Sequence, residues 1–173
     1  MRVFFAIWPD VSVADRLEGL AKELRLACGG KTTRKESIHL TLVFLGEVEN
    51  TDVLKDAAAG ISASAFEIRM DKTAYWKHNR IAWAGTESIP ERLHELVNAL
   101  RLVLEKAGFG FDKRSYVPHV TLVRHAREPK TLPEFEPFSW AASEFCLVGS
   151  SDSGYQILEK WPLKIDAAFQ VPG

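Results

Sequence analysis

The sequence has few cysteines, no long apolar run and no marked excess of charge. Cys28 and Cys146 are the two cysteines among 173 residues, and without a Cys-x-x-Cys spacing they predict free thiols in a reducing compartment. No apolar run approaches the ~20 residues of a bilayer helix, so we expect a cytoplasmic protein without a membrane span. The net charge of −1 excludes a chain-wide attraction to nucleic acid, and any phosphate recognition must therefore be local.

The sequence does contain enough apolar residues to build a core. Hydrophobic residues make up 46% of the chain and include 10 Phe and 5 Trp, a content that excludes intrinsic disorder. The length fits one domain, which we expect to span residues 1–173. The start, residues 2–8, is a short and dense apolar run that predicts a first strand and not a signal peptide.

Hydrophobic periodicity predicts three helices among several strands. The helices begin near Ser12, at Thr51 and at Pro90, and the last one ends at Gly108, where a left-handed cap is expected. Apolar runs bounded by turn residues predict strands over residues 2–8, 38–45, 66–76, 80–86, 117–123, 138–148 and 155–163.

The order of these elements repeats. A helix, a basic loop and a histidine-containing strand occur once in each half of the chain, with a hairpin between the two copies. Two copies of a helix-on-sheet half predict an α+β fold. We expect a bilobal, pseudo-twofold arrangement of two mainly antiparallel sheets, with the helices packed outside and a central cleft.

The two histidine-containing strands carry the same motif. IHLTLV (38–43) and PHVTLV (118–123) both contain His-x-Thr-Leu-Val. Because side chains alternate along a strand, His39 shares a face with Thr41, and His119 shares a face with Thr121. A pseudo-twofold relation between the halves would bring these four side chains into one small volume.

Two imidazoles and two hydroxyls in one volume suit phosphoryl chemistry. An imidazole donates or accepts a proton near neutral pH, so one ring can activate water while the other protonates a leaving oxygen. Threonine hydroxyls are short, rigid donors for the non-bridging oxygens. No carboxylate-rich cage accompanies the motifs, and we expect a site that uses neither a metal nor another cofactor.

The segments IHLTLVFLGEV (38–48) and YVPHVTLVR (116–124) resemble the two His-x-Thr-x signatures of the two-histidine phosphoesterase superfamily. More specifically, they are similar to its bacterial and archaeal branch, the RNA 2′,3′-cyclic phosphodiesterases, also called 2′-5′ RNA ligases. RVFFAIWP (2–9) and YQILEKWPL (155–163) extend the resemblance to nearly the whole chain. It implies a bilobal α+β fold and hydrolysis of a 2′,3′-cyclic phosphate to a 2′-phosphomonoester. It also implies reversible, ATP-independent joining of RNA ends through a 2′-5′ linkage.

The resemblance also implies roles for individual residues. Carried over by position, His39 is the general acid that protonates the leaving 3′ oxygen, and His119 is the general base that activates water. Thr41 and Thr121 hold phosphate oxygens, and Arg124 clamps the phosphate. Strict alternation would point Arg124 away from His119, so we expect a bulge or the end of the strand to turn it inward.

Recognition of the substrate's base needs further side chains. Aromatic rings stack on unpaired bases, and we name Tyr116 and Trp76 as substrate-binding candidates, with Tyr75 as a third possibility by position. The expected partners are RNA ends or nucleotides that carry a 2′,3′-cyclic phosphate, bound by a monomer.

Three alternatives stay open at this point. The same catalyst could act on a small cyclic nucleotide or an ADP-ribose cyclic phosphate, because a near-neutral chain suits a small ligand. A nucleotide- or RNA-binding module without turnover would keep the same fold. His125 lies close to His119 and raises the hypothesis of a zinc site, although no cysteine or carboxylate completes a tetrahedral spacing.

Overall fold

The computed structural model describes residues 1–167 and 169. Within these residues the chain forms, in order, β1 (Arg2–Ile7), α1 (Val11–Cys28), β2 (Lys31–Thr32), a 3₁₀ turn η1 (Lys35–Ser37), β3 (Leu40–Glu47), α2 (Asp52–Ala59), β4 (Phe66–Met70), β5 (Lys72–Trp76), β6 (Ile81–Gly85), α3 (Glu91–Lys106), β7 (His119–Arg124), β8 (Phe138–Ala142), β9 (Glu144–Ser151) and β10 (Gly154–Pro162). No helix of this described part is long and apolar enough to cross a membrane.

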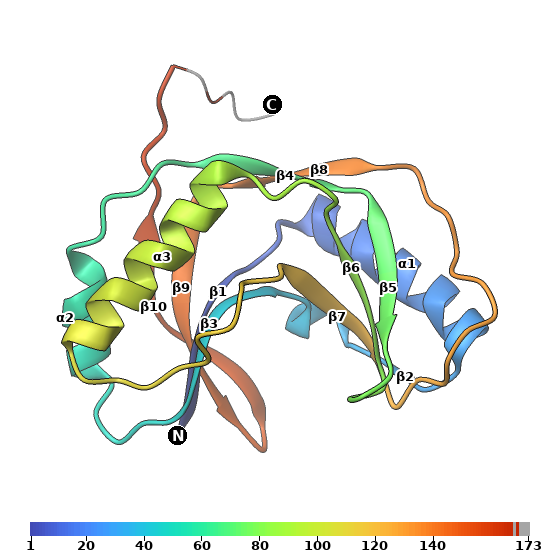
Figure 1. Ribbon diagram of the computed structural model, residues 1–173, viewed down its shortest axis with the longest axis horizontal. Coiled ribbons are helices and arrows are strands. Elements are labelled where there is room, and N and C mark those ends of the chain that lie inside the picture. Colours follow the sequence, from blue (N-terminus) through green and yellow to red (C-terminus); the bar gives the residue numbers. More distant parts are fainter. Residues whose placement is uncertain (168, 170–173) are drawn as a thin grey trace.

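The strands form two antiparallel sheets that lie side by side (Figure 1). The first sheet has the order β10-β9-β1-β3 and the second has the order β2-β7-β6-β5. A separate two-stranded ribbon, β4-β8, runs along the top of the molecule in Figure 1 and spans both halves. These elements confirm the predicted α+β fold with two antiparallel sheets.

Two of the predicted strands are each divided in the structure. Residues 66–76 form β4 and β5, which separate at Asp71, and residues 138–148 reach across β8 and β9, which separate at Ser143. The first piece of each pairs with the other, whereas β5 joins the second sheet and β9 joins the first. The division therefore marks the two places where the chain passes from the ribbon into a main sheet.

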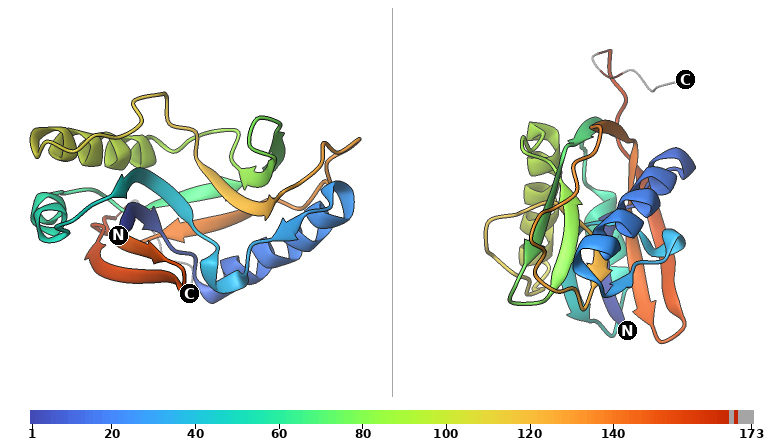
Figure 2. Two further views of the ribbon diagram at one scale, coloured as in Figure 1. Left: turned by 90° about the horizontal axis from the view of Figure 1, so that it is seen from below. Right: turned by 90° about the vertical axis from the view of Figure 1, so that its right-hand side faces the viewer.

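Each long helix packs on the sheet that does not contain the strand preceding it. α1 follows β1 of the first sheet but packs on β7 and β2, and α3 follows β6 of the second sheet but packs on β3. Figure 2 shows the two helices on opposite outer sides of the molecule. The buried faces are apolar stripes at helical spacing, which include Val13, Leu17, Leu20, Ala21 and Leu24 in α1 and Leu93, Leu96, Val97, Leu100 and Leu104 in α3.

The helix ends follow local chemistry. The side chain of Asp10 accepts a 2.8 Å hydrogen bond from the backbone N–H of Val13, so the N-cap of α1 is Asp10 and the helix begins slightly before the predicted Ser12. Gly29 ends α1 with φ 65° and ψ −153°, outside the left-handed helical region, and Gly108 follows α3 with φ 86°. Glycine adopts such positive φ angles readily. Because α1 packs on β7 and α3 packs on β3, the two motif strands are held next to each other at the centre of the molecule.

Candidate active site

Both motif histidines line one cavity between the two sheets. His39 lies directly before β3, and His119 is the first residue of β7. The cavity has a volume of about 910 Å³, and Thr41, Thr121 and Arg124 line it together with the two imidazoles. The structure thus places the five polar side chains that the motifs singled out around a single space.

The two imidazoles are held in the same way. The Nδ1 atom of His39 donates a 2.8 Å hydrogen bond to the carbonyl oxygen of Ser37, and Nδ1 of His119 donates a 2.9 Å bond to the carbonyl oxygen of Val117. A carbonyl oxygen only accepts, so Nδ1 carries the proton in both rings. Each ring therefore presents Nε2 as its proton-exchanging atom. In the neutral ring of His39, Nε2 accepts a 3.0 Å hydrogen bond from the Thr41 hydroxyl.

A bulge follows the threonine in both motifs. Thr121 and Val123 of β7 pair with consecutive residues of β6, which leaves Leu122 as an extra residue. Thr41 and Val43 of β3 likewise pair with consecutive residues of β1, and Leu42 is the extra residue. Because two successive residues then face the core, the side-chain alternation reverses beyond the bulge.

The bulge in β7 turns Arg124 toward the cavity, as the sequence analysis required. Leu122 and Val123 are both fully buried, and Arg124 lines the cavity together with His119 and Thr121. In the other motif the equivalent position is occupied by Phe44, which lines the same cavity. The two halves thus supply one guanidinium and one aromatic ring at matching places.

The rings of His39 and His119 sit in different aromatic surroundings. The faces of Phe4 and Trp8 both stack on His39 with centroid distances of 4.9 Å, and Tyr155 contacts it edge-on at 5.2 Å. His119 is contacted edge-on by Trp76 at 4.6 Å and by Trp83 at 5.9 Å. These contacts restrict each ring to one orientation.

Burial and neighbouring charge favour the neutral form of both imidazoles. Burial lowers the pKa of His39 to about 4, partly opposed by the hydrogen bond to Ser37, with repulsion from Arg124 and His119 lowering it further. Burial also lowers the pKa of His119, and Arg124 acts in the same direction. A protonated ring in this cavity is therefore a strong proton donor, and an anion bound there would favour its charged form.

The aromatic side chains predicted to bind the base lie elsewhere. The described residues that line the cavity include Phe44 and Tyr155 but neither Tyr116 nor Trp76. Tyr116 packs against the core, and its hydroxyl donates a 2.8 Å hydrogen bond to the backbone carbonyl of Thr41. Burial raises the pKa of this phenol. Trp76 packs against His119 and Trp83.

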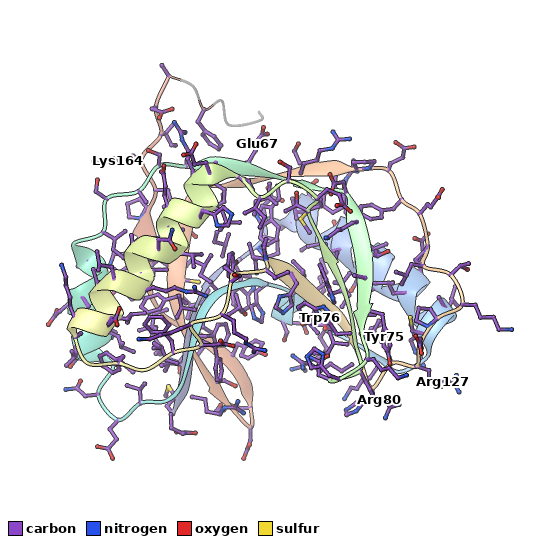
Figure 3. The ribbon with its side chains drawn as sticks, in the orientation of Figure 1. Glu67, Tyr75, Trp76, Arg80, Arg127 and Lys164 are labelled. Atoms are coloured by element: carbon purple, nitrogen blue, oxygen red, sulfur yellow. The ribbon has the colours of Figure 1, made fainter. Side chains whose placement is uncertain are left out.

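Figure 3 shows where the two neighbouring aromatic residues of β5 lie. Trp76 is on the side nearer the middle of the molecule, whereas Tyr75 lies with Arg80 and Arg127 at the outer end. The Tyr75 hydroxyl donates to the carbonyl oxygen of Ala126, outside the cavity. Both residues therefore support the framework around β7.

Phe44 is one of the cavity-lining aromatic residues that were not predicted from the sequence. Its side chain is 45% exposed in the cavity wall, and the Arg2 guanidinium lies over its ring, 5.2 Å from the centroid. Aligning the two motifs would have placed Phe44 opposite Arg124, five residues after each histidine. That alignment becomes informative only if both strands are known to carry the same bulge.

His125 also lines the cavity, with a positive φ of 55°. Within residues 1–167 and 169, no group of three or more His, Cys, Asp or Glu side chains is arranged to hold a metal ion. The cavity wall also carries cationic side chains, and one of them, Arg124, directly follows the second motif at the end of β7.

Comparison with known proteins agrees with the geometry. The sequence model of the family described as LigT like Phosphoesterase matches residues 7–83 and 85–157. An RNA 2′,3′-cyclic phosphodiesterase of Escherichia coli (strain K12) is 32% identical over 170 residues, covering 94% of this chain and 96% of that protein. One of Thermotoga maritima is 29% identical over 167 residues, covering 87% of each chain. A crystal structure of E. coli LigT complexed with 3′-AMP matches with a TM-score of 0.86 at 32% identity, over 94% of this chain and 97% of that one.

Proposed function

This chain belongs to the LigT-like phosphoesterase family, and from that membership and the geometry of its cavity we propose that it hydrolyses 2′,3′-cyclic phosphates at RNA ends or on nucleotides. The product is a 2′-phosphomonoester. The observation that carries this proposal is the matched pair of imidazoles, each with Nδ1 fixed on a backbone carbonyl and each lining the same cavity.

The proposed reaction uses one ring as a base and the other as an acid. Nε2 of neutral His119 takes a proton from water as the water oxygen attacks phosphorus. The bond between phosphorus and the 3′ oxygen breaks, and His39 donates the proton on its Nε2 to that oxygen. The step leaves His119 protonated and His39 neutral, and proton exchange with solvent restores the starting state.

The remaining polar groups stabilise the charge on the phosphoryl oxygens. Arg124 supplies a guanidinium that can contact two oxygens at once, and the hydroxyls of Thr41 and Thr121 supply short donors. We propose that these groups replace a metal ion in the reaction. With a ribose 5′-hydroxyl in place of water, the same two rings would join RNA ends through a 2′-5′ linkage without ATP.

The surroundings of Phe44 suit the base of the terminal nucleotide. A half-exposed aromatic ring in the wall of a phosphate-binding cavity provides a flat face for stacking, and the Arg2 guanidinium packs on the same ring. We therefore assign base stacking to Phe44 in place of Tyr116 and Trp76.

The test is to incubate the purified protein with EDTA and a nucleoside 2′,3′-cyclic phosphate, and to identify the product by chromatography. A nucleoside 2′-monophosphate formed at an undiminished rate in EDTA is the expected result. A 3′-monophosphate would reverse the leaving group assigned to His39. Loss of turnover in EDTA, restored by zinc, would instead favour a metal site near His125.

A binding module of the same fold is separated by a second measurement. Calorimetric titration with a nucleoside 2′-monophosphate should show binding, and the turnover assay should show product from the same preparation. Binding without any turnover would favour the module and overturn the proposed hydrolysis.

A further inference from the structure

β2 lies directly against the strand that carries the second motif. Its two residues pair with the end of β7, so that Lys31 stands opposite Arg124 and Thr32 opposite Val123. The Thr33 hydroxyl extends this contact with a 2.9 Å hydrogen bond to the carbonyl oxygen of Thr121. The two-residue strand β2 and the residue that follows it are therefore hydrogen-bonded to β7, which forms part of the cavity wall.

Glycine makes this close approach possible. A Cβ atom on Gly30 would lie 2.4 Å from the carbonyl oxygen of Arg124, and Gly30 has φ 82°, which side-chain-bearing residues rarely adopt. The chain therefore passes over the end of β7 at a distance that only glycine permits. The result is that Lys31 is brought beside Arg124.

The pairing of Lys31 with Arg124 is unfavourable unless an anion joins them. Like charges placed directly opposite each other on antiparallel strands destabilise a sheet. Both residues line the cavity, and so does Arg34 just beyond β2. Within the described part of the chain no carboxylate forms a salt bridge with any of the three, whereas the adjacent Lys35 is paired with Asp15.

The cavity as a whole has an excess of cations. Arg2, Lys31, Arg34 and Arg124 line it, and Asp152 is the one carboxylate among the described residues in its wall. One cyclic phosphate carries one negative charge, which Arg124 alone can meet. The additional cations therefore have no counterpart in a substrate with a single phosphate.

One of these additional cations, Arg34, also lines a second cavity next to the first. Thr32, Thr33 and Arg34 line both the main cavity and a smaller adjoining one of about 270 Å³. The smaller cavity lies between α1 and the segment before β3, with Lys22, Lys35, Glu18 and Glu36 in its wall. The space next to the catalytic centre thus continues past Arg34.

We propose that Lys31 and Arg34 bind the phosphodiester that links the terminal nucleotide to its 5′ neighbour in an RNA chain. This inference rests on the proposed hydrolysis of the cyclic phosphate at His39 and His119. Opposed residues on antiparallel strands have Cα atoms about 5 Å apart, so the second phosphate binds beside the first. The substrate of this site is therefore the end of an oligonucleotide, and a mononucleotide occupies only part of it.

The test compares two substrates that differ by one nucleotide. One is a nucleoside 2′,3′-cyclic phosphate, and the other is a dinucleotide that ends in the same group. In the unaltered protein we expect kcat/KM to be about tenfold higher for the dinucleotide, because hydrogen bonds to charged groups are the stronger ones. A dinucleotide with an uncharged methylphosphonate linkage should lose this advantage.

Substitutions of Lys31 and Arg34 test whether these residues cause the higher kcat/KM of the dinucleotide. Lys31→Gln and Arg34→Gln should each lower the ratio of the two kcat/KM values, and together they should bring it close to one. Lys106→Gln, at the exposed end of α3, is the matched control and should keep the ratio. Because the double variant lacks two positive charges, its kcat/KM for the dinucleotide should also depend less on salt concentration.

Three results would overturn the proposal. The ratio could be unity in the unaltered protein, or it could survive in the double variant. The methylphosphonate dinucleotide could also react as fast as the natural one. A protein that turns over neither substrate would refute the proposed hydrolysis itself, which is a different outcome because the mononucleotide alone reveals it.

Discussion

The hydroxyl of Tyr116 donates a 2.8 Å hydrogen bond to the backbone carbonyl oxygen of Thr41. Tyr116 precedes the second motif by two residues, and Thr41 belongs to the first motif. The bond therefore ties together the two stretches of chain that carry His39 and His119. Tyr116, which the sequence suggested as a base-binding residue, thus connects the two motif regions through its hydroxyl and does not line the cavity.

Removing the Tyr116 hydroxyl should disturb the positioning of the two histidines without weakening substrate binding. Tyr116→Phe leaves a carbonyl without its partner, and we expect the free energy of unfolding to fall by about 1–3 kcal/mol. We also expect kcat to fall about tenfold with KM unchanged, because small displacements of catalytic groups are costly. Steady-state kinetics and urea unfolding measure the two effects.

Tyr75→Phe is the matched control for this substitution. The Tyr75 hydroxyl donates to the carbonyl oxygen of Ala126, away from the cavity. It should lower stability without lowering kcat. If both variants lose the same activity, or if Tyr116→Phe keeps full kcat, the tie between the motifs does not position the histidines.

A change of leaving atom should distinguish the acid from the base. When sulfur replaces the 3′ bridging oxygen of the cyclic phosphate, the leaving thiolate needs no proton, since thiols ionise near pH ~8.5. We expect His39→Ala to be slowed ~10²–10⁴-fold on the oxygen substrate but less than about tenfold on the sulfur substrate. The His119→Ala variant should react slowly with both the oxygen and the sulfur substrate. The opposite pattern would exchange the two roles.

The dependence of activity on pH follows from the depressed pKa values. In the proposed reaction the competent form has His39 protonated and His119 neutral, and its population falls tenfold per pH unit above both pKa values. Because the pKa of His39 is about 4 and that of His119 lies below the ordinary 6.5, kcat/KM should decline steadily from about pH 6.5 upward.

The profile of kcat should lie at higher pH than that of kcat/KM. A bound phosphate anion favours protonated rings, so the substrate complex keeps its acid over a wider range. Initial rates between pH 4 and 9 at low and saturating substrate give both profiles. A kcat/KM that rises to a plateau above pH 8 would contradict the assigned protonation states.

Much of this arrangement follows from the sequence, and the exceptions have identifiable causes. The repeated motif predicted that both histidines and both threonines meet, and the family resemblance, which is confirmed, added Arg124. The expected inward direction of Arg124 in turn predicted a bulge or a strand end there. The bulge itself depends on pairing with β6, which no local pattern reveals. Periodicity likewise cannot show that residues 66–76 change partners at Asp71, because both pieces are strands.

The aromatic residues were the least predictable part of the site. Tyr116, Trp76 and Phe44 all lie near the motifs in sequence or at the ends of strands. Whether such a ring faces the core or the cavity depends on how the two sheets meet, and that is a tertiary property. Phe44 is exposed in the cavity wall because the bulge at Leu42 reverses the alternation of β3.

The neutral, buried ring of His39 should also make the fold sensitive to acid. Its pKa of about 4 lies below the ordinary value of 6.5, so between these pH values the unfolded chain binds a proton that the folded chain does not. Stability is therefore lost as pH falls from 6.5 to 4, by about 2–3 kcal/mol from this ring.

Urea unfolding of the unaltered protein and of His39→Gln at pH 6.5 and 4.5 measures this contribution. The variant should lose less stability than the unaltered protein over the same interval. His119 acts in the same direction and remains in both proteins, so the difference between them isolates His39. Identical losses would show that the pKa of His39 in the folded state is not lowered below its ordinary value.

If His39 and His119 act on the same phosphorus atom, removing either imidazole must stop the reaction while the fold persists. Single-turnover rates on a nucleoside 2′,3′-cyclic phosphate in EDTA, with unfolding curves for each variant, decide this. We expect His39→Ala and His119→Ala each to lose at least about 100-fold, and the double variant to lose little more than the slower single one. A folded single variant that keeps a rate within about twofold of the unaltered protein would show that the two rings do not share one phosphoryl group.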